Sequence, residues 1–279
     1  MSSAGERAEI RPATEGAPPA GAPRRLHIAG VPVDALTQAE AIAWVLQRAR
    51  AGGPPAYVVT PNAHHAGLLR DSARFRRAYD SAGLSVADGV SLVWASRVLG
   101  APLPARVPGV DLFEAVCEAV AGSGLRVFLL GGRPGAAEGA ARALRKSYPG
   151  LEVAGTYCPP VGFEADATES RRVADAVRAA APHVLFVALG APKQEVWLQD
   201  HLAELGVPVG VGVGAAFDFV SGQVRRAPPW MRRVGLEWLF RVMVEPRRLW
   251  KRYAVYNTRL VALVFRQRLG GGVRAKRSG

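Results

Sequence analysis

The sequence is poor in cysteine and has no long apolar run. Its 279 residues include two cysteines, Cys117 and Cys158, which form no recognisable disulfide or metal-binding pattern. Cys117 falls in an apolar helical stretch and is expected to be a small core residue. The longest candidate for membrane insertion, LVALVF at 260–265, is far shorter than the roughly 18–20 residues that span a bilayer. These absences argue against a disulfide framework and a transmembrane helix, and they predict a reducing, cytoplasmic location.

Several catalytic signatures are missing as well. The glycine-rich turn GGRPG at 131–135 fits neither G-x-G-x-x-G nor G-x-x-x-x-G-K-[ST], so dinucleotide or P-loop chemistry has no support there. The stretch GAAFDF is not a nucleophile elbow, and no Ser/His/Asp arrangement is evident. The neighbouring His64 and His65 have no metal-ligand spacing with other His, Cys or Asp residues, which favours a structural or surface role.

Acidic residues are scarce at one end of the chain. Residues 225–279 hold 15 Lys/Arg and two Asp/Glu, so they carry the whole formal net charge of +13, while residues 1–224 hold 21 charged residues of each sign. A neutral body with a basic end predicts an anionic partner, which is either a nucleic acid or an anionic lipid surface.

The sequence does contain an alternation of apolar β-prone runs with helical stretches. In the clearest unit, LRVFLLGGRPGAAEGAARALRKSYPG, a strand and a glycine-rich turn precede a helix from about residue 136 to 147. An earlier helix starts after Thr37, a plausible N-cap, with Glu40 completing a capping box. This alternation predicts an α/β fold, a Rossmann-like parallel sheet flanked by helices, with a basic helical C-terminal appendage.

The composition divides the chain into three parts. Residues 1–25 are rich in Pro, Gly and Ala and lack the apolar stretch of a signal peptide, so they predict a disordered leader. Residues 26–224 form the predicted α/β core. Residues 225–279 are the predicted appendage, basic and amphipathic.

Five predicted strands end in unusual residues. Ligands of open parallel sheets bind beyond the carboxyl ends of the strands, which here read TPN (60–62), ADG (87–89), GGRPG (131–135), GAPKQE (190–195) and GVGAAFDF (212–219). Asp88 is either a helix N-cap or a general base at the mouth of the sheet. Gly131 and Gly132 allow either an ordinary tight turn or a close approach of backbone N–H groups to a diphosphate.

The GAPKQE segment gathers three polar residues where a helix begins after a buried strand. Lys193 could neutralise a phosphate, and Gln194 could read a base or sugar edge. Alternatively, the three residues form a solvated first turn in which Glu195 complements the helix dipole. The residues alone leave both interpretations open.

Together these motifs resemble one family. In the same order and at the same spacing, the WecG/TagA/CpsF glycosyltransferases contain TPNAHH, ADGVSLVWASRVLG, RVPGVDL, LLGGRPG, GAPKQEVW and GVGAAFDFVSGQVRRAPPWMRRVGLEWLFRVMVEPRR. The resemblance covers about residues 26–253. It implies an inverting enzyme that moves an N-acetylmannosamine-type sugar from a UDP-sugar to a polyprenyl-diphosphate-linked sugar, in bacterial surface polysaccharide or teichoic acid synthesis. It also implies that no metal or other cofactor is needed, which matches the missing D-x-D signature.

The resemblance further implies roles for single residues. Asp88 matches the proposed general base, and Thr60 matches a residue that lines the same pocket. Asn62 helps to orient the acceptor, and Arg106 meets the charge of the diphosphate. Gln194 and Asp218 match contacts to the nucleotide sugar, Asp218 through the ribose hydroxyls. The remaining predicted substrate-binding positions are Gly131, Gly132, Lys193 and Glu195.

Some positions depart from the commoner family pattern. Pro61 and the histidine pair follow Thr60 where many members have other residues, and Pro108 replaces a small residue before Gly109. These changes leave the sugars open, and another UDP-hexose in exopolysaccharide synthesis is the alternative donor. The sequence allows a homo-oligomer without indicating one.

The appendage mixes aromatic and basic residues. Trp238, Trp250, Tyr253 and Tyr256 beside arginines suit a membrane interface, where aromatic rings lie at headgroup depth. This pattern predicts peripheral attachment to the inner face of the plasma membrane, where a lipid-linked acceptor would be found. In the alternative, the apolar face packs on the core and the arginines are merely solvated. By resemblance, the site also receives Arg241, Arg248 and Lys251, which would stabilise the leaving diphosphate.

Two other classes compete with this interpretation. A basic segment with aromatics could bind nucleic acid, yet no helix-turn-helix, RRM or OB signature supports that partner. An NAD-dependent oxidoreductase would share the fold, but its glycine fingerprint and acidic ribose-binding residue are missing.

Overall fold

The computed structural model describes residues 23–270 and 275–277, and for residues 248, 249, 251, 252 and 275–277 it describes the backbone only. Most of the predicted leader therefore lies outside the described residues. The first strand, β1, already begins at Arg24, slightly before the predicted end of the leader.

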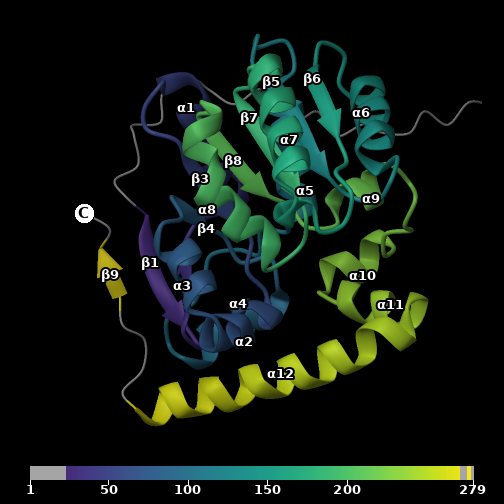
Figure 1. Cartoon of the computed structure of the whole chain (residues 1–279). Coiled ribbons are helices and arrows are strands. Elements are labelled where there is room, and N and C mark those ends of the chain that lie inside the picture. The colour runs from purple at the N-terminus through teal and green to yellow at the C-terminus, as the bar shows by residue number, and fades with distance from the viewer. Residues whose placement is uncertain (1–22, 271–274, 278–279) are drawn as a thin grey trace, which may run out of the picture.

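A six-stranded parallel sheet forms the centre of the molecule (Figure 1). Its strands follow the order β4-β3-β8-β7-β5-β6, and every neighbouring pair runs parallel. The middle strands are continuous runs such as VLFVA with every residue buried, as expected for a sheet that is covered on both faces. The predicted Rossmann-like fold is confirmed. The strands are β3 (Ala56–Val59), β4 (Leu84–Ser85), β5 (Arg126–Gly131), β6 (Glu152–Tyr157), β7 (Val184–Ala188) and β8 (Val209–Gly212).

Two layers of helices cover the sheet, each with its own apolar core. One layer holds α2 (Ala63–Asp71), α3 (Ala73–Asp80), α7 (Ala167–Ala180) and α8 (Lys193–Leu205). The other holds α1 (Gln38–Ala51), α5 (Gly109–Val120), α6 (Ala136–Ser147) and α9 (Ala216–Val220). Two further elements are α4 (Val90–Val98) and a short 3₁₀ turn, η1 (Phe163–Ala165). The capping box predicted for Thr37 and Glu40 is present at the start of α1.

A small antiparallel sheet joins the two ends of the described chain. Its order is β2-β1-β9, with β1 (Arg24–Ile28), β2 (Val31–Asp34) and β9 (Ala275–Arg277). Ala29 and Gly30 connect β1 to β2 with φ angles of 53° and 81°, which suits a tight two-residue hairpin turn.

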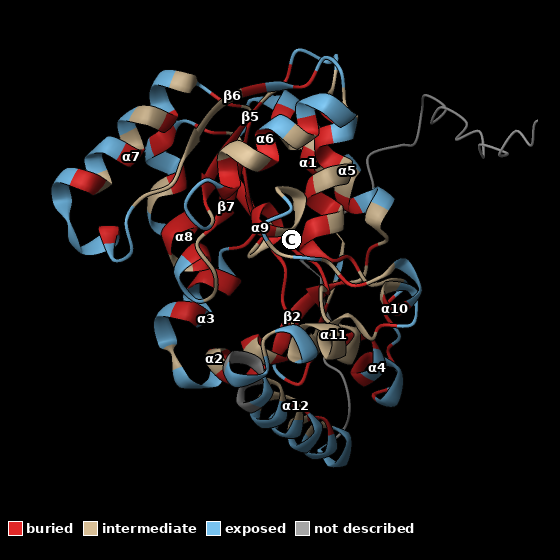
Figure 2. Ribbon diagram, turned by 90° about the vertical axis from the view of Figure 1, so that its right-hand side faces the viewer, coloured by how far each residue is buried: buried red, intermediate tan, exposed pale blue. Residues whose placement is uncertain are grey.

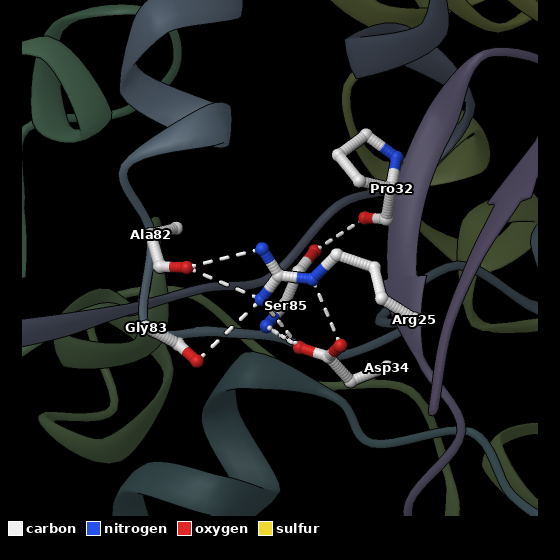
Figure 3. Close-up of polar contacts among 6 residues, drawn as sticks. All are labelled: Arg25, Pro32, Asp34, Ala82, Gly83 and Ser85. Atoms are coloured by element: carbon white, nitrogen blue, oxygen red, sulfur yellow. Dashed lines mark hydrogen bonds and ion pairs between the residues drawn. The ribbon is translucent and has the colours of Figure 1, made fainter. Parts of the chain in front are cut away.

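A buried ion pair fixes this hairpin to the central sheet (Figure 3). Arg25 donates to Asp34 from two nitrogens, at 2.9 and 2.8 Å, and also to the carbonyl of Ala82. Asp34 additionally accepts the backbone N–H of Ser85 at 2.8 Å. The bidentate contact with Arg25 on β1 and the bond to Ser85 on β4 let the Asp34 carboxylate connect β2 to both strands.

The appendage continues from the core as three helices. These are α10 (Pro229–Arg233), α11 (Glu237–Val244) and α12 (Pro246–Leu269), and α12 runs along the lower edge of the molecule beside α2 and α4 (Figure 1). Leu260 and Val264 of α12 are buried against the core. The side-chain amide of Gln267 accepts from the N–H of Ala29 and donates to the carbonyl of His27, both at 2.7 Å. The predicted helical appendage is confirmed, and one face of it packs on the core.

Candidate active site

The fold brings the five predicted strand ends to one edge of the sheet. Strands β4, β3, β8, β7 and β5 are consecutive neighbours and parallel, so the residues that follow them lie in a row. The chain leaves β5 toward β6 and leaves β7 toward β8, in opposite directions, which makes the β5–β7 boundary a topological switch point. Crevices at such points are the usual ligand sites of this architecture.

Asp88 lies at this edge, directly after β4. Its backbone N–H donates to the carbonyl of Pro61 at 2.9 Å, which couples the ADG turn to the TPN turn. Burial raises the pKa of the Asp88 carboxyl and the carboxylate of Glu237 raises it further, whereas Arg106, Arg241 and His65 act in the opposite direction. The carboxylate is thus a partly desolvated base with cationic groups nearby.

Thr60 connects two of the strand ends at this edge. Its hydroxyl is buried and donates to the carbonyl of Gly212 at 2.9 Å, linking the end of β3 to the end of β8. A Cβ at Gly109 would stand 3.3 Å from the same hydroxyl oxygen. The Thr60 side chain therefore positions the loops in this structure, and its predicted place in the reaction stays a prediction.

Asn62 is the N-cap of α2. Its side-chain oxygen accepts the N–H of His64 at 3.1 Å, and its own N–H donates to Nδ1 of His65 at 2.9 Å. This reciprocal capping box fixes the first turn of α2 next to the Asp88 turn, where a Cβ at Gly89 would stand 2.9 Å from the Asn62 Cβ. The structural role predicted for the histidine pair agrees with the position of His65.

Arg106 connects the site to the appendage. Its guanidinium lies 3.7 Å from the carboxylate of Glu237 and donates to the carbonyl of Arg232 at 3.4 Å. Glu237 is also held by Arg226 at 3.0 Å, and Arg226 in turn contacts Asp111 at 2.6 Å. These ion pairs place the first turn of α11 beside Asp88.

In the glycine turn after β5, the N–H groups of Gly132 and Arg133 both donate hydrogen bonds within the protein. Gly131 and Gly132 have φ angles of 97° and 84°, and a Cβ at Gly131 would stand 2.9 Å from the carbonyl oxygen of Ala188. The N–H of Gly132 donates to that same carbonyl at 2.9 Å, and the N–H of Arg133 donates to Asp218 at 3.2 Å. The glycines thus serve the close contact of β5 with β7. A diphosphate that used these donors would have to displace existing partners.

Arg133 is a cation that the sequence reasoning missed. Its guanidinium lies 3.3 Å from the buried Asp218 carboxylate and 3.2 Å from Glu245 at the joint of α11 and α12. Its position in GGRPG was the available signal, because a residue that follows a parallel strand lies at the carboxyl edge of the sheet. Asp218 is at the predicted edge, with an arginine as its partner.

The three residues of the PKQE motif point in different directions. Gln194 is 3% exposed; its amide accepts the N–H of Gly214 at 3.0 Å and donates to Glu195 at 2.9 Å. A Cβ at Gly212 would stand 2.9 Å from its Nε2. Lys193 is half exposed and pairs with Glu164 at 3.1 Å. Of the two open interpretations, a solvated first turn fits Lys193 but not Gln194 or Glu195, which are both buried.

A buried polar cluster lies beneath the site and was also missed. Nε2 of His65 lies 3.5 Å from the fully buried Glu195 carboxylate, and the ring of His65 is 6.1 Å from that of Tyr79. In the described part of the chain, His65 Nε2, Tyr79 Oη and the second Glu195 oxygen have no hydrogen-bond partner. The spacing of Asn62 and His65, three residues apart at a helix start, was the available signal for one member.

Of the three predicted cations of the appendage, Arg241 is the one whose side chain the structure describes. The Arg241 guanidinium lies 5.3 Å from the ring of Phe219 and acts electrostatically on Asp88. The side chains of Arg248 and Lys251 lie outside the described residues, although their backbone belongs to the first turns of α12.

The described residues offer neither a metal site nor a membrane-spanning helix. They include no group of three or more His, Cys, Asp or Glu side chains that could hold a metal ion. The helices in this part of the chain are too short or too polar to cross a bilayer.

A Rossmann-like sheet with the Asp88 carboxylate near two arginines at its carboxyl edge is the layout of an α/β enzyme. The profile of the Glycosyl transferase WecG/TagA/CpsF family matches residues 26–274. The chain therefore belongs to this family and is a glycosyltransferase, as the motifs predicted.

The names of two relatives agree with this assignment. The chain is 34% identical over 197 residues to the N-acetylglucosaminyldiphosphoundecaprenol N-acetyl-beta-D-mannosaminyltransferase of Bacillus spizizenii, covering 71% of this chain and 74% of the relative. It is 30% identical over 196 residues to the enzyme of the same name from Staphylococcus aureus, covering 70% and 73%.

Proposed function

We propose that this glycosyltransferase moves N-acetylmannosamine from UDP to a polyprenyl-diphosphate-linked N-acetylglucosamine, with inversion at the anomeric carbon. The acceptor and the transferred sugar follow the names of the Bacillus and Staphylococcus relatives. The product would be an early intermediate of a bacterial surface polymer. The observation that carries the proposal is the partly desolvated Asp88 with Arg106 and Arg241 near it.

In the proposed reaction, Asp88 removes the proton from the acceptor hydroxyl. The hydroxyl oxygen forms a bond to the anomeric carbon of the donor sugar while the bond from that carbon to the diphosphate oxygen breaks. The leaving UDP keeps the electron pair and needs positive charge rather than a proton. A raised pKa makes Asp88 a better base than an exposed aspartate, because basicity rises with pKa.

The cations near Asp88 supply the charge for the leaving group. Arg106 is partly neutralised by Glu237, so a diphosphate arriving at the site would compete with that carboxylate for the guanidinium. Arg133 stands in the same relation to Asp218 and Glu245 at the glycine turn. On this basis, substrate binding exchanges internal ion pairs for pairs with the diphosphate.

The appendage would bring this site to the lipid-linked acceptor. Trp250, Val261, Phe265 and Leu269 on α12 are 53%, 54%, 61% and 87% exposed. Arginines interleave with them, and each basic group near an anionic leaflet contributes about 1 kcal/mol. We therefore place the enzyme in the cytoplasm, peripherally attached to the membrane, while Leu260 and Val264 on the inner face of α12 pack on the core. In Figure 2, α11 is only half-buried between α12 and the core.

A donor screen tests the proposed function. Purified enzyme, a short-chain polyprenyl-diphosphate-GlcNAc analogue and a panel of UDP-sugars are assayed for UDP release and for the disaccharide product. UDP-N-acetylmannosamine is expected to give product, and Asp88→Asn is expected to abolish it. Product with a different UDP-hexose alone would replace the donor in this proposal, and activity of the Asp88 variant at the wild-type level would remove the base.

A further inference from the structure

A concave site lies between α2 and α12, outside the catalytic edge. It has a volume of about 350 Å³, within the lower part of the range of roughly 300–1,000 Å³ that ligand pockets occupy. The second half of α2 and the second half of α12 line it, whereas Asn62, at the start of α2, faces the strand ends. We call this site the α2–α12 groove.

The α2–α12 groove is cationic. Arg70 comes from α2, and Arg259 and Arg266 come from α12, against one carboxylate, that of Asp71. The Arg259–Asp71 contact is 3.6 Å long, with both side chains more than half exposed, so it holds the cation only loosely. Three guanidinium groups around one hollow repel each other, and an anion placed among them would relieve this repulsion. Guanidinium groups are suited to phosphate because they offer paired N–H donors.

The floor of the groove is apolar. Gly67 and Leu263 lie there, and the aromatic ring of Tyr256 comes so close to Gly67 that a Cβ would stand 3.1 Å from it. A small floor with cations around it suits a ligand that has a charged head and an apolar body.

The position of the groove on α12 identifies the source of that ligand. Val261, Phe265 and Leu269 form the exposed apolar stripe, and Arg259 and Arg266 project from the adjoining side of the same helix. If the stripe enters the acyl region of a bilayer, the groove opens at headgroup depth, where lipid phosphates are.

We propose that the α2–α12 groove binds the phosphate of an anionic phospholipid. Arg70 from one side and Arg259 and Arg266 from the other would share the phosphodiester oxygens, so the lipid would hold α12 against α2. Because α2 carries Asn62 and His65 at its other end, this contact would make the catalytic edge more rigid at the membrane than in solution. The inference takes the membrane-facing side of α12 from the proposed function and does not depend on which sugar is transferred.

Binding to vesicles tests the groove. The variant Arg70→Gln/Arg266→Gln removes two cations from it, and the control Arg77→Gln/Arg97→Gln removes the same charge from the exposed surfaces of α3 and α4. The probes are phosphatidylcholine vesicles with added phosphatidylglycerol, or with oleate adjusted to the same surface charge. Wild-type protein is expected to prefer phosphatidylglycerol. The groove variant is expected to lose about tenfold in affinity for it and to lose the preference, whereas the control keeps the preference.

Several results would overturn the proposal. Equal losses in the groove and control variants, or equal wild-type binding to both vesicle types, would mean that diffuse charge alone attracts the membrane. Thermal stabilisation by inorganic phosphate that the groove variant loses, with vesicle preference unchanged, would make free phosphate the ligand. Transfer to a short-chain acceptor without vesicles is measured in parallel. If the wild type transfers no sugar in this assay, the proposed function is contradicted, whereas the vesicle result still tests the groove.

Discussion

Glu237, on the first turn of α11, lies 3.7 Å from the guanidinium of Arg106, and this contact joins the appendage to the catalytic edge. Glu237 is also paired with Arg226, so its carboxylate bridges two arginines of different segments. The same carboxylate raises the pKa of Asp88. One residue of the appendage therefore affects both the arginine that would meet the diphosphate and the base that would activate the acceptor.

Replacing Asp88 with asparagine should separate activity from stability. Loss of a general base is expected to lower kcat by about 10²–10⁴-fold. Since the folded-state pKa of Asp88 is raised, the folded protein favours the protonated carboxyl. The stability that this gives is fully present below the ordinary pKa of the group and is lost as the pH rises through the raised pKa. Asp88→Asn should therefore raise Tm at neutral pH and lose this advantage in acid.

Thermal unfolding over a pH series, together with turnover assays, checks this prediction. Asp175→Asn on the exposed face of α7 is the control and should change neither quantity much. A lower Tm for Asp88→Asn at neutral pH would mean that the carboxylate supports the fold, which speaks against a base held for catalysis.

The charge of Glu237 should set the lower limit of the active pH range. Glu237→Gln removes a neighbour that raises the pKa of Asp88, so the acidic limb of the kcat/KM profile should move to lower pH. Arg106→Gln should move it to higher pH, because the guanidinium lowers the same pKa. Glu114→Gln is the matched control: Glu114 also contacts Arg226, at 3.6 Å, and is not among the groups that act on Asp88. A limb at the same pH in all three variants would assign the titration to another group.

The sequence was sufficient to predict which strand ends share one edge of the sheet. Apolar strands alternating with helices impose a parallel sheet, and parallel strands necessarily end at the same edge, so TPN, ADG, GGRPG and PKQE were expected to meet. Asp88 follows this rule. The direction of a side chain beyond a strand end does not follow from the pattern, because one turn of a loop decides it. Gln194 is turned inward to the N–H of Gly214, a contact between residues that are 20 positions apart.

The arrangement of the appendage could not be predicted either. Its charge and aromatic residues suited both a membrane surface and packing on the core. The structure accommodates both, because one face of α12 packs on the core and another face is exposed. Gln267 bonds to Ala29 across 238 positions, and the sequence has no local signal for such a contact. The ion pair of Glu237 with Arg106 also joins two segments that lie far apart in the sequence.

Gln194 is expected to be a positioning residue with a large effect on stability. Gln194→Ala would leave the N–H of Gly214 and one oxygen of Glu195 without these partners, and each buried unpaired group costs about 1–3 kcal/mol. Chemical denaturation measures the loss. Lys193→Ala at the neighbouring exposed position is the control and should cost less than about 1 kcal/mol. A Gln194→Ala protein with wild-type stability and a raised KM for the UDP-sugar would instead support direct contact with the nucleotide.

Tyr79→Phe should be neutral or stabilising. The Tyr79 hydroxyl is fully buried in the cluster with His65 and Glu195 and has no hydrogen-bond partner among the described residues. Removing it ends the cost of burying an unpaired hydroxyl, so the free energy of unfolding should rise by up to about 1 kcal/mol. Tyr57→Phe is the comparison, because the Tyr57 hydroxyl donates to the carbonyl of Ala78 and its loss should destabilise. Destabilisation of Tyr79→Phe to the same extent would show that the hydroxyl has a partner in solution.

The two faces of α12 should respond differently to substitution. Leu260 is buried against the core, so Leu260→Ala should lower the free energy of unfolding by about 2–3 kcal/mol and leave binding to anionic vesicles within a few-fold of the wild type. Phe265 is 61% exposed, so Phe265→Glu should leave stability nearly unchanged and lower recovery with vesicles in a flotation assay, since it places a charge where an apolar side chain would enter the bilayer. Val161→Glu, at an exposed site on the core, is the control for the added charge. If Phe265→Glu floats with the vesicles as well as the wild type does, the exposed stripe of α12 is not the membrane contact, and the groove beside it loses its argument for a lipid ligand.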